Sequence, residues 1–320
     1  MRLARSLCAA AALLAAVPSL AQSWPDKPIR LVVSFAPGGV HDTLARLLQP
    51  RLTEALGQPI VIENRAGAGG NIAAEAVAKS APDGSTFLVA SEAIATNEYL
   101  YRSMAYDPYK DLVPVAKLAD YPMALIANPS LEANNVRELV ALAKAKPGSI
   151  SYGSAGIGAS GHLAGELFKS VTGTNMVHVP YKGGAPALAD LIAGRIQVMF
   201  LSIQLSAPQA RQGRVKVLAV TGDKRSPRLP DVPTTAEQGY PDVQALLFSS
   251  LLAPRGTPPA IVKRMNAEVV KALDAPEVKQ RLADLGAIPA PSSPEGFAGV
   301  LRREGERWGK LIREKDIHAN

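Results

Sequence analysis

The stretch that decides the fold covers residues 35–48 and reads FAPGGVHDTLARLL. It follows a strand-like run that begins at Ile29, and it opens a helical pattern whose leucines recur on one face. The Pro-Gly-Gly turn at residues 37–39 lies between the two, where glycine lets a ligand approach the backbone closely. Asp42 is predicted to be the N-cap of the helix. A glycine turn before a helix N-terminus is typical of an anion site, although an ordinary strand-to-helix connection shows the same pattern.

The same order of strand, loop and helix recurs along the first part of the chain. Strands are predicted at residues 29–35, 60–62 and 86–90, and helices at residues 42–56 and 72–79, the first of them kinked or ended by Pro50. This alternation predicts a parallel sheet with right-handed crossovers. The three loops after the strands, FAPGGVHD, ENRAGAGGN and SEAIATN, should therefore lie along one sheet edge, where ligands bind in such sheets.

A second series of strands and glycine-rich loops predicts a second lobe. Its strands are expected at residues 123–128, 150–152, 176–179, 197–201 and 215–221, and its helices at 136–145, 162–171 and 186–193. Asn135 and Glu138 have the spacing of a capping box at the first of these helices. Residues 99–118 look irregular, and a strand at 244–253 precedes helices at 258–274, 276–285 and 294–315. No strand series accompanies these last helices, so they are expected to pack on the first lobe and make it discontinuous.

Composition favours a soluble globular protein that is exported. Of 320 residues, 47% are hydrophobic and 20% charged, and the net charge is +7. The basic residues are scattered and aromatic residues make up only 5%, which disfavours nucleic-acid binding. Residues 1–21 are typical of a cleavable signal peptide, with Arg2 and Arg5 before a short apolar run. The only cysteine, Cys8, lies inside that run, so cysteine chemistry is not expected in the exported chain.

The motifs for nucleotide, metal or catalytic chemistry are incomplete. GIGASG at residues 156–161 fits the dinucleotide pattern, but no acidic residue ends the next strand. The four histidines lack metal-ligand spacing, and no phosphate-binding GxxxxGK[ST] loop is present. A secreted hydrolase using Ser160 or His162 stays open as an alternative, without a G-x-S-x-G frame. We expect no cofactor, no metal and no catalytic residue, and instead a small anion bound by backbone donors between two lobes that close like a hinge.

The chain after residue 21 resembles the substrate-binding proteins of tripartite tricarboxylate transporters, also called the Bug family. The resemblance rests on short motifs spread over nearly all of it: WP with KPI at 24–29, the 35–42 loop, ENR with GAGG at 63–70, PDG at 82–84, YDP at 106–108, AKAKPG at 143–148, SAG with HL at 154–163, HVPYKG at 178–183, LPDVPT at 229–234 and LAP at 252–254. It implies a two-lobed α/β fold of the type II periplasmic binding protein ("Venus flytrap") kind, each lobe a mostly parallel sheet flanked by helices. The implied division is 22–124 and 244–320 for the first lobe and 125–243 for the second.

The resemblance also implies how a ligand is held. In such proteins a ligand carboxylate is bound in the cleft by backbone N–H groups and bridging waters, not by an arginine. The loops and strand ends that match are implied to supply the ligand-binding residues Phe35, Pro37, Gly38, Gly39, Asp42, Ala68, Gly69, Gly70, Asn71, Ser91, Ser154, Ile157, Gly158, Ser160, His162, Tyr181 and Ser202. Arg65 could in principle clamp a carboxylate, but it is expected to pair with Glu63 or a neighbouring loop carboxylate. Leu201, Phe248 and Ser250 depart from the family's common residues, which are Asp, Trp and Gly.

The sequence as a whole therefore predicts a periplasmic protein that binds a small mono-, di- or tricarboxylate without a chemical step. Its expected partner is a membrane permease of the tripartite tricarboxylate type, and a monomer is expected. Presentation of the ligand to a membrane sensor is the other binding function that the sequence leaves open, beside the hydrolase.

Overall fold

The structure is a computed structural model that describes residues 24–319. The predicted signal peptide and Cys8 lie outside the described residues. Among those residues, none of the helices combines the length and the apolar character needed to cross a membrane.

The first lobe is built on the predicted parallel strands. Strands β1 (Ile29–Val33), β2 (Ile60–Asn64) and β3 (Thr86–Ser91) pair in the order β2-β1-β3, and both pairings are parallel. Helices α2 (Val40–Leu56) and α3 (Asn71–Ala78) make the crossovers, and a 3-10 turn, η1 (Ala68–Gly70), leads into α3. Helix α2 continues past Pro50 to Leu56, so the expectation that Pro50 ends its first section is wrong. The three candidate loops do lie at one end of this sheet, as parallel pairing requires.

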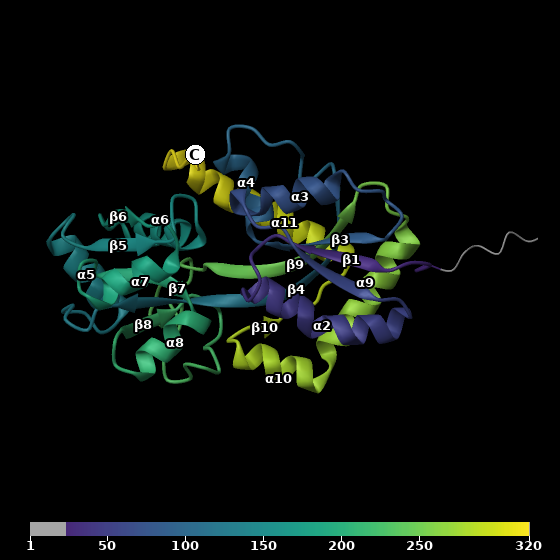
Figure 1. Ribbon diagram of the computed structural model, residues 1–320. Coiled ribbons are helices and arrows are strands. Elements are labelled where there is room, and N and C mark those ends of the chain that lie inside the picture. The colour runs from purple at the N-terminus through teal and green to yellow at the C-terminus, as the bar shows by residue number, and fades with distance from the viewer. Residues whose placement is uncertain (1–23, 320) are drawn as a thin grey trace, which may run out of the picture.

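One long strand joins the two lobes. Strand β4 (Leu112–Ala127) pairs with β9 (Leu246–Pro254) through its first part, and with β7 (Val198–Ser202) from Met123 onward. Strand β9 also pairs antiparallel with β3, which places it in the first lobe, and the short strand β10 (Ile288–Pro289) pairs with β4. In Figure 1, β4 and β9 run through the middle of the molecule, between the helices of the two lobes. The predicted lobe boundaries at residues 124 and 243 remain a prediction.

The second lobe continues the same sheet. Its strands follow in the order β4-β7-β5-β6, with β5 (Ser151–Ser154) parallel to both β7 and β6 (Val177–Pro180). Strand β8 (Lys216–Val220) pairs antiparallel with β4. Helices α5 (Val136–Ala145), α6 (Ser160–Thr172), α7 (Gly184–Ile192) and α8 (Ile203–Arg211) flank these strands. The fold is thus α/β and two-lobed, as predicted.

Side chains alternate between the two faces of each sheet, so each lobe has two cores. In β1, Leu31 and Val33 join a core with α2, α9 (Pro259–Asp274) and α10 (Pro276–Asp284), whereas Val32 faces α3 on the other side. In β4, Leu125 and Ile126 divide in the same way between the two cores of the second lobe. Helices therefore cover both faces, which is the arrangement that parallel sheets require.

Two helices were not predicted, and a third packs differently from the prediction. SEAIATN was predicted to be a loop, but α4 (Ala93–Leu100) begins inside it, and α8 follows β7 directly. Helix α11 (Pro294–Glu314) was expected on the first lobe. Phe297 lies in a core of that lobe, but Trp308 and Ile312 pack in a core of the second lobe. Figure 1 shows α11 running beside α4 toward the second lobe, so this helix contacts both lobes.

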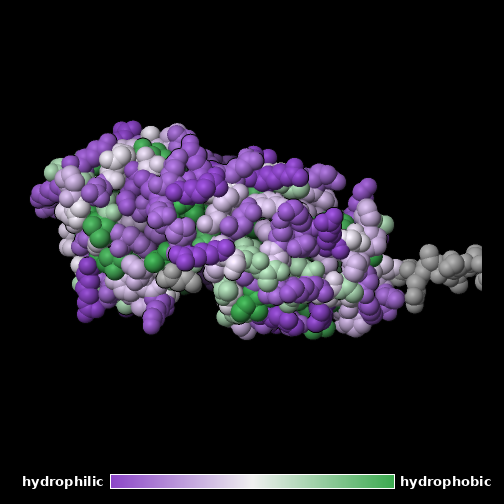
Figure 2. Space-filling model, turned by 90° about the horizontal axis from the view of Figure 1, so that it is seen from above, coloured by the Kyte–Doolittle hydropathy of each residue, from purple (hydrophilic) through white to green (hydrophobic). Residues whose placement is uncertain are grey.

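The surface seen in Figure 2 is mostly hydrophilic, with small and separate hydrophobic groups. Among the described residues, the large apolar side chains that are exposed are Val61, Ile72, Tyr109, Ile157, Val171, Val177 and Leu205. Two of these, Ile157 and Leu205, line the cavity described next.

Candidate functional site

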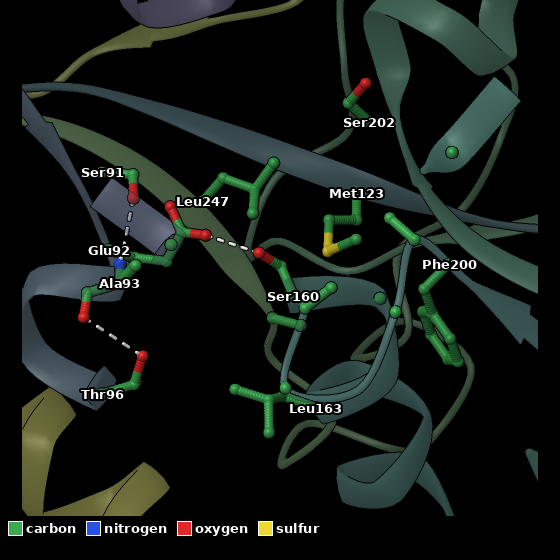
Figure 3. Close-up of a pocket in the computed structure, with 18 of the residues that line it drawn as sticks. Ser91, Glu92, Ala93, Thr96, Met123, Ser160, Leu163, Phe200, Ser202 and Leu247 are labelled. Carbon is green, nitrogen blue, oxygen red and sulfur yellow. Dashed lines mark hydrogen bonds between the residues drawn. The ribbon is translucent and has the colours of Figure 1, made fainter. Parts of the chain in front are cut away.

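A cavity of about 500 Å³ lies between the two lobes. The first lobe contributes Ser91 at the end of β3, the start of α4, and Gly69 of η1. The second lobe contributes the glycine-rich loop at residues 155–161 and Ser202 at the end of β7. Met123 of β4, Leu247 of β9 and Trp308 of α11 complete the wall. Figure 3 shows side chains from both lobes directed toward the same space.

Several helices begin at this cavity. The first residues of α4, α6 and α7, which are Ala93, Ser160 and Gly184, line it, as does Ser202 just before α8. The first N–H groups of a helix have no partner within the helix, and the helix dipole places partial positive charge there. Converging helix N-termini therefore make the cavity suitable for an anion.

The side chains of the wall add no positive charge. Among the described residues that line the cavity there is no Lys, Arg or His, and Glu92 is the one carboxylate. Arg65 is the residue that the sequence offers as a possible clamp for a carboxylate. It pairs with Glu63 instead, as predicted, with its Nε 2.5 Å from the Glu63 Oε1. An anion in this cavity would be stabilised by backbone N–H groups and not by a cationic side chain.

Glu92 itself makes the contact that joins the lobes across the cavity. Its Oε1 accepts a hydrogen bond from the Ser160 hydroxyl at 2.5 Å, as Figure 3 shows. Burial raises the pKa of the Glu92 carboxyl, and the hydrogen bond from Ser160 acts in the opposite direction. Glu92 was not among the predicted site residues, because nothing in the sequence SEAIATN indicates that its side chain enters the cavity.

The predicted site residues divide into those that line the cavity and those that lie behind it. The structure places the following in the wall: Phe35, Gly69, Ser91, Ile157, Gly158, Ser160 and Ser202. The others are absent from the wall: Pro37, Gly38, Gly39, Asp42, Ala68, Gly70, Asn71, Ser154, His162 and Tyr181. Ligand contact by any of these residues remains a prediction.

Asp42 is not the N-cap of α2, which corrects the prediction. The N-cap is Gly39, and Asp42 is the third residue of the helix. From there its buried carboxylate reaches back to accept the Gly38 N–H at 2.9 Å, and it also accepts from Arg46 and Asn64. Burial raises the pKa of Asp42, but these three hydrogen bonds outweigh it and leave the pKa below its ordinary value.

The glycine turn before α2 is consequently held by the protein itself. The Gly38 N–H donates to Asp42, and the Gly39 N–H donates to the Ala36 carbonyl at 3.4 Å. Gly70 has a φ of +95° and its α-carbon faces the Ser34 side chain, where an added Cβ would lie 3.1 Å away. These residues shape the first-lobe side of the cleft through the backbone.

The residues behind the second-lobe loop hold it in place. Ser154 is fully buried, and its Oγ lies 2.7 Å from Nε2 of His178. His162 accepts the Gly158 N–H on Nδ1 at 3.0 Å and stacks on His178 with ring centroids 3.8 Å apart. Tyr181 donates its hydroxyl proton to Asp190 at 2.8 Å. The serine and histidine of the hydrolase alternative thus have other partners, since Ser160 donates to Glu92.

A large apolar part of the wall was also not predicted. It consists of Leu100, Met123, Leu163, Leu246, Leu247 and Trp308, which come from five different elements.

Three residues were named above as differing from the residues common in the family. Of these, Leu201 lines the cavity. Phe248 and Ser250 lie in β9 outside it, and the Ser250 hydroxyl donates to the Ala90 carbonyl. The expectation of an altered distal pocket therefore concerns Leu201.

A cleft between two α/β lobes, framed by helix N-termini, defines a two-lobed solute-binding protein. The family model described as tripartite tricarboxylate transporter family receptor matches residues 44–317, and the chain belongs to this family. It is 38% identical to the protein BugT of Bordetella pertussis strain Tohama I over 301 residues, which is 93% of this chain and 92% of that protein.

Two solved structures of similar proteins are complexes with carboxylates. The R. palustris protein Rpa4515 with adipate is 40% identical, with a TM-score of 0.80 over 92% of this chain and 99% of that chain. MatC of Rhodopseudomonas palustris with bound malate is 37% identical, with a TM-score of 0.74 over 90% of this chain and 100% of that chain.

Proposed function

We propose that this chain is a periplasmic solute-binding protein that captures a small carboxylate in the cleft and passes it to a permease of the tripartite tricarboxylate type. The observation that carries the proposal is the cavity in which α4, α6 and α7 begin and which no cationic side chain lines among the described residues. The relatives with adipate and malate support a carboxylate as the ligand. The family supports export and a permease as the partner.

The ligand is held, in this proposal, by backbone N–H groups and bridging waters, and no chemical step follows. A carboxylate at the start of α6 would accept from N–H groups that have no partner within the helix. Contact with both lobes favours the form in which the lobes enclose the ligand, and this form docks on the permease. The protein acts as a monomer.

A thermal-shift screen of the exported chain tests the function. Adipate, malate and citrate are the probes, and adipamide, which has the shape of adipate without its charge, is the control. A ligand that binds only the folded protein at 100 times its dissociation constant stabilises it by about 2.7 kcal/mol. We expect a higher melting temperature with at least one acid and no change with adipamide. No shift with any carboxylate would contradict the proposal.

Two substitutions of Ser160 test whether backbone N–H groups bind the ligand. Ser160→Ala removes the hydroxyl only, whereas Ser160→Pro removes the hydroxyl and the N–H. Proline suits this position because Ser160 is the first residue of α6 and Ala159 before it is extended, with φ −63° and ψ 154°. Since a hydrogen bond to a charged group contributes about 1.5–3 kcal/mol, Ser160→Pro should bind the carboxylate at least roughly tenfold more weakly than Ser160→Ala. Equal affinities, measured by calorimetry, would show that this N–H is not a ligand donor.

A further inference from the structure

Glu92 occupies an unusual position for an acidic residue in a cavity suited to anions. It lies between the end of β3 and the start of α4, and its carboxylate reaches Ser160, the first residue of α6. The carboxylate therefore lies close to two helix N-termini, one from each lobe. Figure 3 shows Glu92 and Ser160 pointing toward each other.

The second oxygen of this carboxylate is not satisfied. Glu92 Oε2 is buried and has no hydrogen-bond partner among the described residues. A buried acceptor without a partner costs about 1–3 kcal/mol, and more when it is charged. A proton on Glu92 removes most of that cost, because the neutral acid needs less solvation than the carboxylate.

Within residues 24–319, no cation compensates the charge of Glu92. The groups that face it are the Ser160 hydroxyl on α6, the Phe248 N–H on β9 and, farther off on β4, the phenol of Tyr121. Burial raises the pKa of Tyr121 to about 12, so the phenol is neutral. Trp308 is the residue of α11 in the cavity wall, and its Nε1 donates to Glu304. Burial raises the pKa of Glu92, and the hydrogen bond from Ser160, together with the nearby backbone N–H groups of Glu92 and Phe248, acts in the opposite direction.

A carboxylate ligand at the same helix N-termini would lie beside Glu92. Two carboxylates at contact distance do not both stay ionised; they share one proton, and one of the two pKa values rises. The ligand's carboxylate is the one that accepts from the helix N–H groups, which stabilise its charged form. The shared proton therefore belongs on Glu92.

We propose that Glu92 is a ligand-recognition residue that is protonated in the complex and donates its O–H to the bound carboxylate, so that ligand binding takes up one proton from solvent. The proposal rests on the carboxylate-binding function proposed above. The proton comes from water or buffer, whose bond to hydrogen breaks as the O–H of Glu92 forms, and no other covalent bond changes. A neutral Glu92 would not act as the counter-ion of a ligand's ammonium group. It would select only weakly against ligands whose ammonium group lies elsewhere in the cavity.

Calorimetry in buffers of different ionisation enthalpy measures the proton uptake directly. The probes are hexanoate, adipate and 6-aminohexanoate, used between about pH 6.5 and 8.5, where their carboxylates are ionised. When binding takes up one proton, the affinity rises about tenfold for each unit by which the pH is lowered. We expect this dependence for hexanoate or adipate above the pKa of Glu92, with nearly one proton taken up per ligand.

Two variants assign the proton to Glu92. Glu92→Gln keeps the size of the side chain and a donor group, so it should bind the same probe at least as tightly, with no proton uptake and no pH dependence. Glu98→Gln changes an exposed carboxylate on the same helix and should keep the proton uptake of the wild type. If Glu92→Gln does not fold, the wild type still provides a test that needs no variant, because binding without proton uptake overturns the inference.

The possible failures are distinct. Binding of hexanoate or adipate without proton uptake overturns this inference and leaves the proposed function intact. Uptake that persists in Glu92→Gln, or tighter binding of 6-aminohexanoate than of hexanoate that Glu92→Gln abolishes, also overturns it. Failure of the wild type to bind any of the three probes, and also malate and citrate, overturns both the inference and the proposed function.

Discussion

Asp42 links three parts of the first lobe through one buried carboxylate. It holds the Gly38 N–H in the turn before α2, the Asn64 amide at the end of β2 and the Arg46 guanidinium one turn further along α2. The first two partners lie beside residues 35–39, because the Asn64 amide also donates to the Phe35 carbonyl, and Phe35 lines the cavity. Asp42 therefore determines the shape of the first-lobe side of the cavity without lining it.

Removing this carboxylate should cost both stability and affinity. We expect Asp42→Ala to lower the free energy of unfolding by about 2 kcal/mol, because it leaves the Gly38 N–H and the Asn64 amide without their partner. Carboxylate binding should weaken as well, because the turn before α2 loses the partner of its Gly38 N–H. Urea unfolding and calorimetry measure the two effects.

The control and the pH dependence of this prediction follow from the charge of Asp42. Asp42→Asn keeps the shape and should lose less stability than Asp42→Ala. Hydrogen bonds leave the pKa of Asp42 below its ordinary value despite burial, so its contribution is complete above that ordinary value and is lost as the pH falls through the lowered pKa. An Asp42→Ala protein with an unchanged urea midpoint would refute this account of the residue.

The start of α5 is an element whose boundary the sequence predicted correctly. Asn135 is the N-cap, and its side chain accepts the Glu138 N–H at 2.9 Å. Glu138 reaches back to the N–H of Asn134, just before the N-cap, so each of the two side chains accepts from a backbone N–H at the start of the helix. The spacing of these two residue types carries the information, because the interaction is local.

This local interaction gives a prediction for the element. Asn135→Ala should destabilise the protein by about 1 kcal/mol, the usual cost of losing an N-cap side chain. Asn135→Asp, which keeps the acceptor, should stay within about half of that cost. Chemical denaturation provides the measurement, and equal losses for the two variants would mean that the cap is not what stabilises α5.

Other elements carried too little signal for the sequence to predict them. Helix α4 buries Ile94 to Asn97 in succession, so no face of it shows the periodicity of an amphipathic helix. Helix α8 contains Pro208, which argues against a helix when it is read locally. Strand β4 contains Pro114 and Pro122, and its pairing with β9 shifts register next to Pro114. These elements form because of tertiary packing, which a single sequence does not show.

The candidate site, like the fold, could be predicted only in part from the sequence. The glycine-rich loop at residues 155–161 and the strand ends Ser91 and Ser202 were found, because strand order fixes the edge on which they lie. Glu92 and Trp308 were not found, because they reach the cavity from a helix start and from α11, far apart in sequence. The sequence thus predicts which edge of the sheet lines the cavity but not which side chains from distant elements meet there.

At the scale of the whole molecule, three elements connect the lobes. Strands β4 and β9 run through the middle of the molecule, and α11 packs Phe297 in one lobe and Trp308 in the other. Trp308 also lines the cavity, so it lies where relative movement of the lobes and ligand contact both change its surroundings. Trp24 packs on Gly84 and Phe87 in the first lobe instead.

These positions predict that tryptophan fluorescence reports ligand binding. The chain has two tryptophans, Trp24 and Trp308. We expect a saturable change in emission when a carboxylate such as adipate is added, retained in Trp24→Phe and lost in Trp308→Phe. A signal that depends on Trp24 would place the binding event outside the cavity between the lobes.

The most direct test of the central claim is a crystal structure of the exported chain grown with adipate. We predict one adipate carboxylate in the cavity between the lobes, within hydrogen-bond distance of backbone N–H groups in the first turn of α6 and beside Glu92, with no Lys or Arg side chain in contact. Adipate bound outside this cavity, or held there by a cationic side chain, would contradict the account.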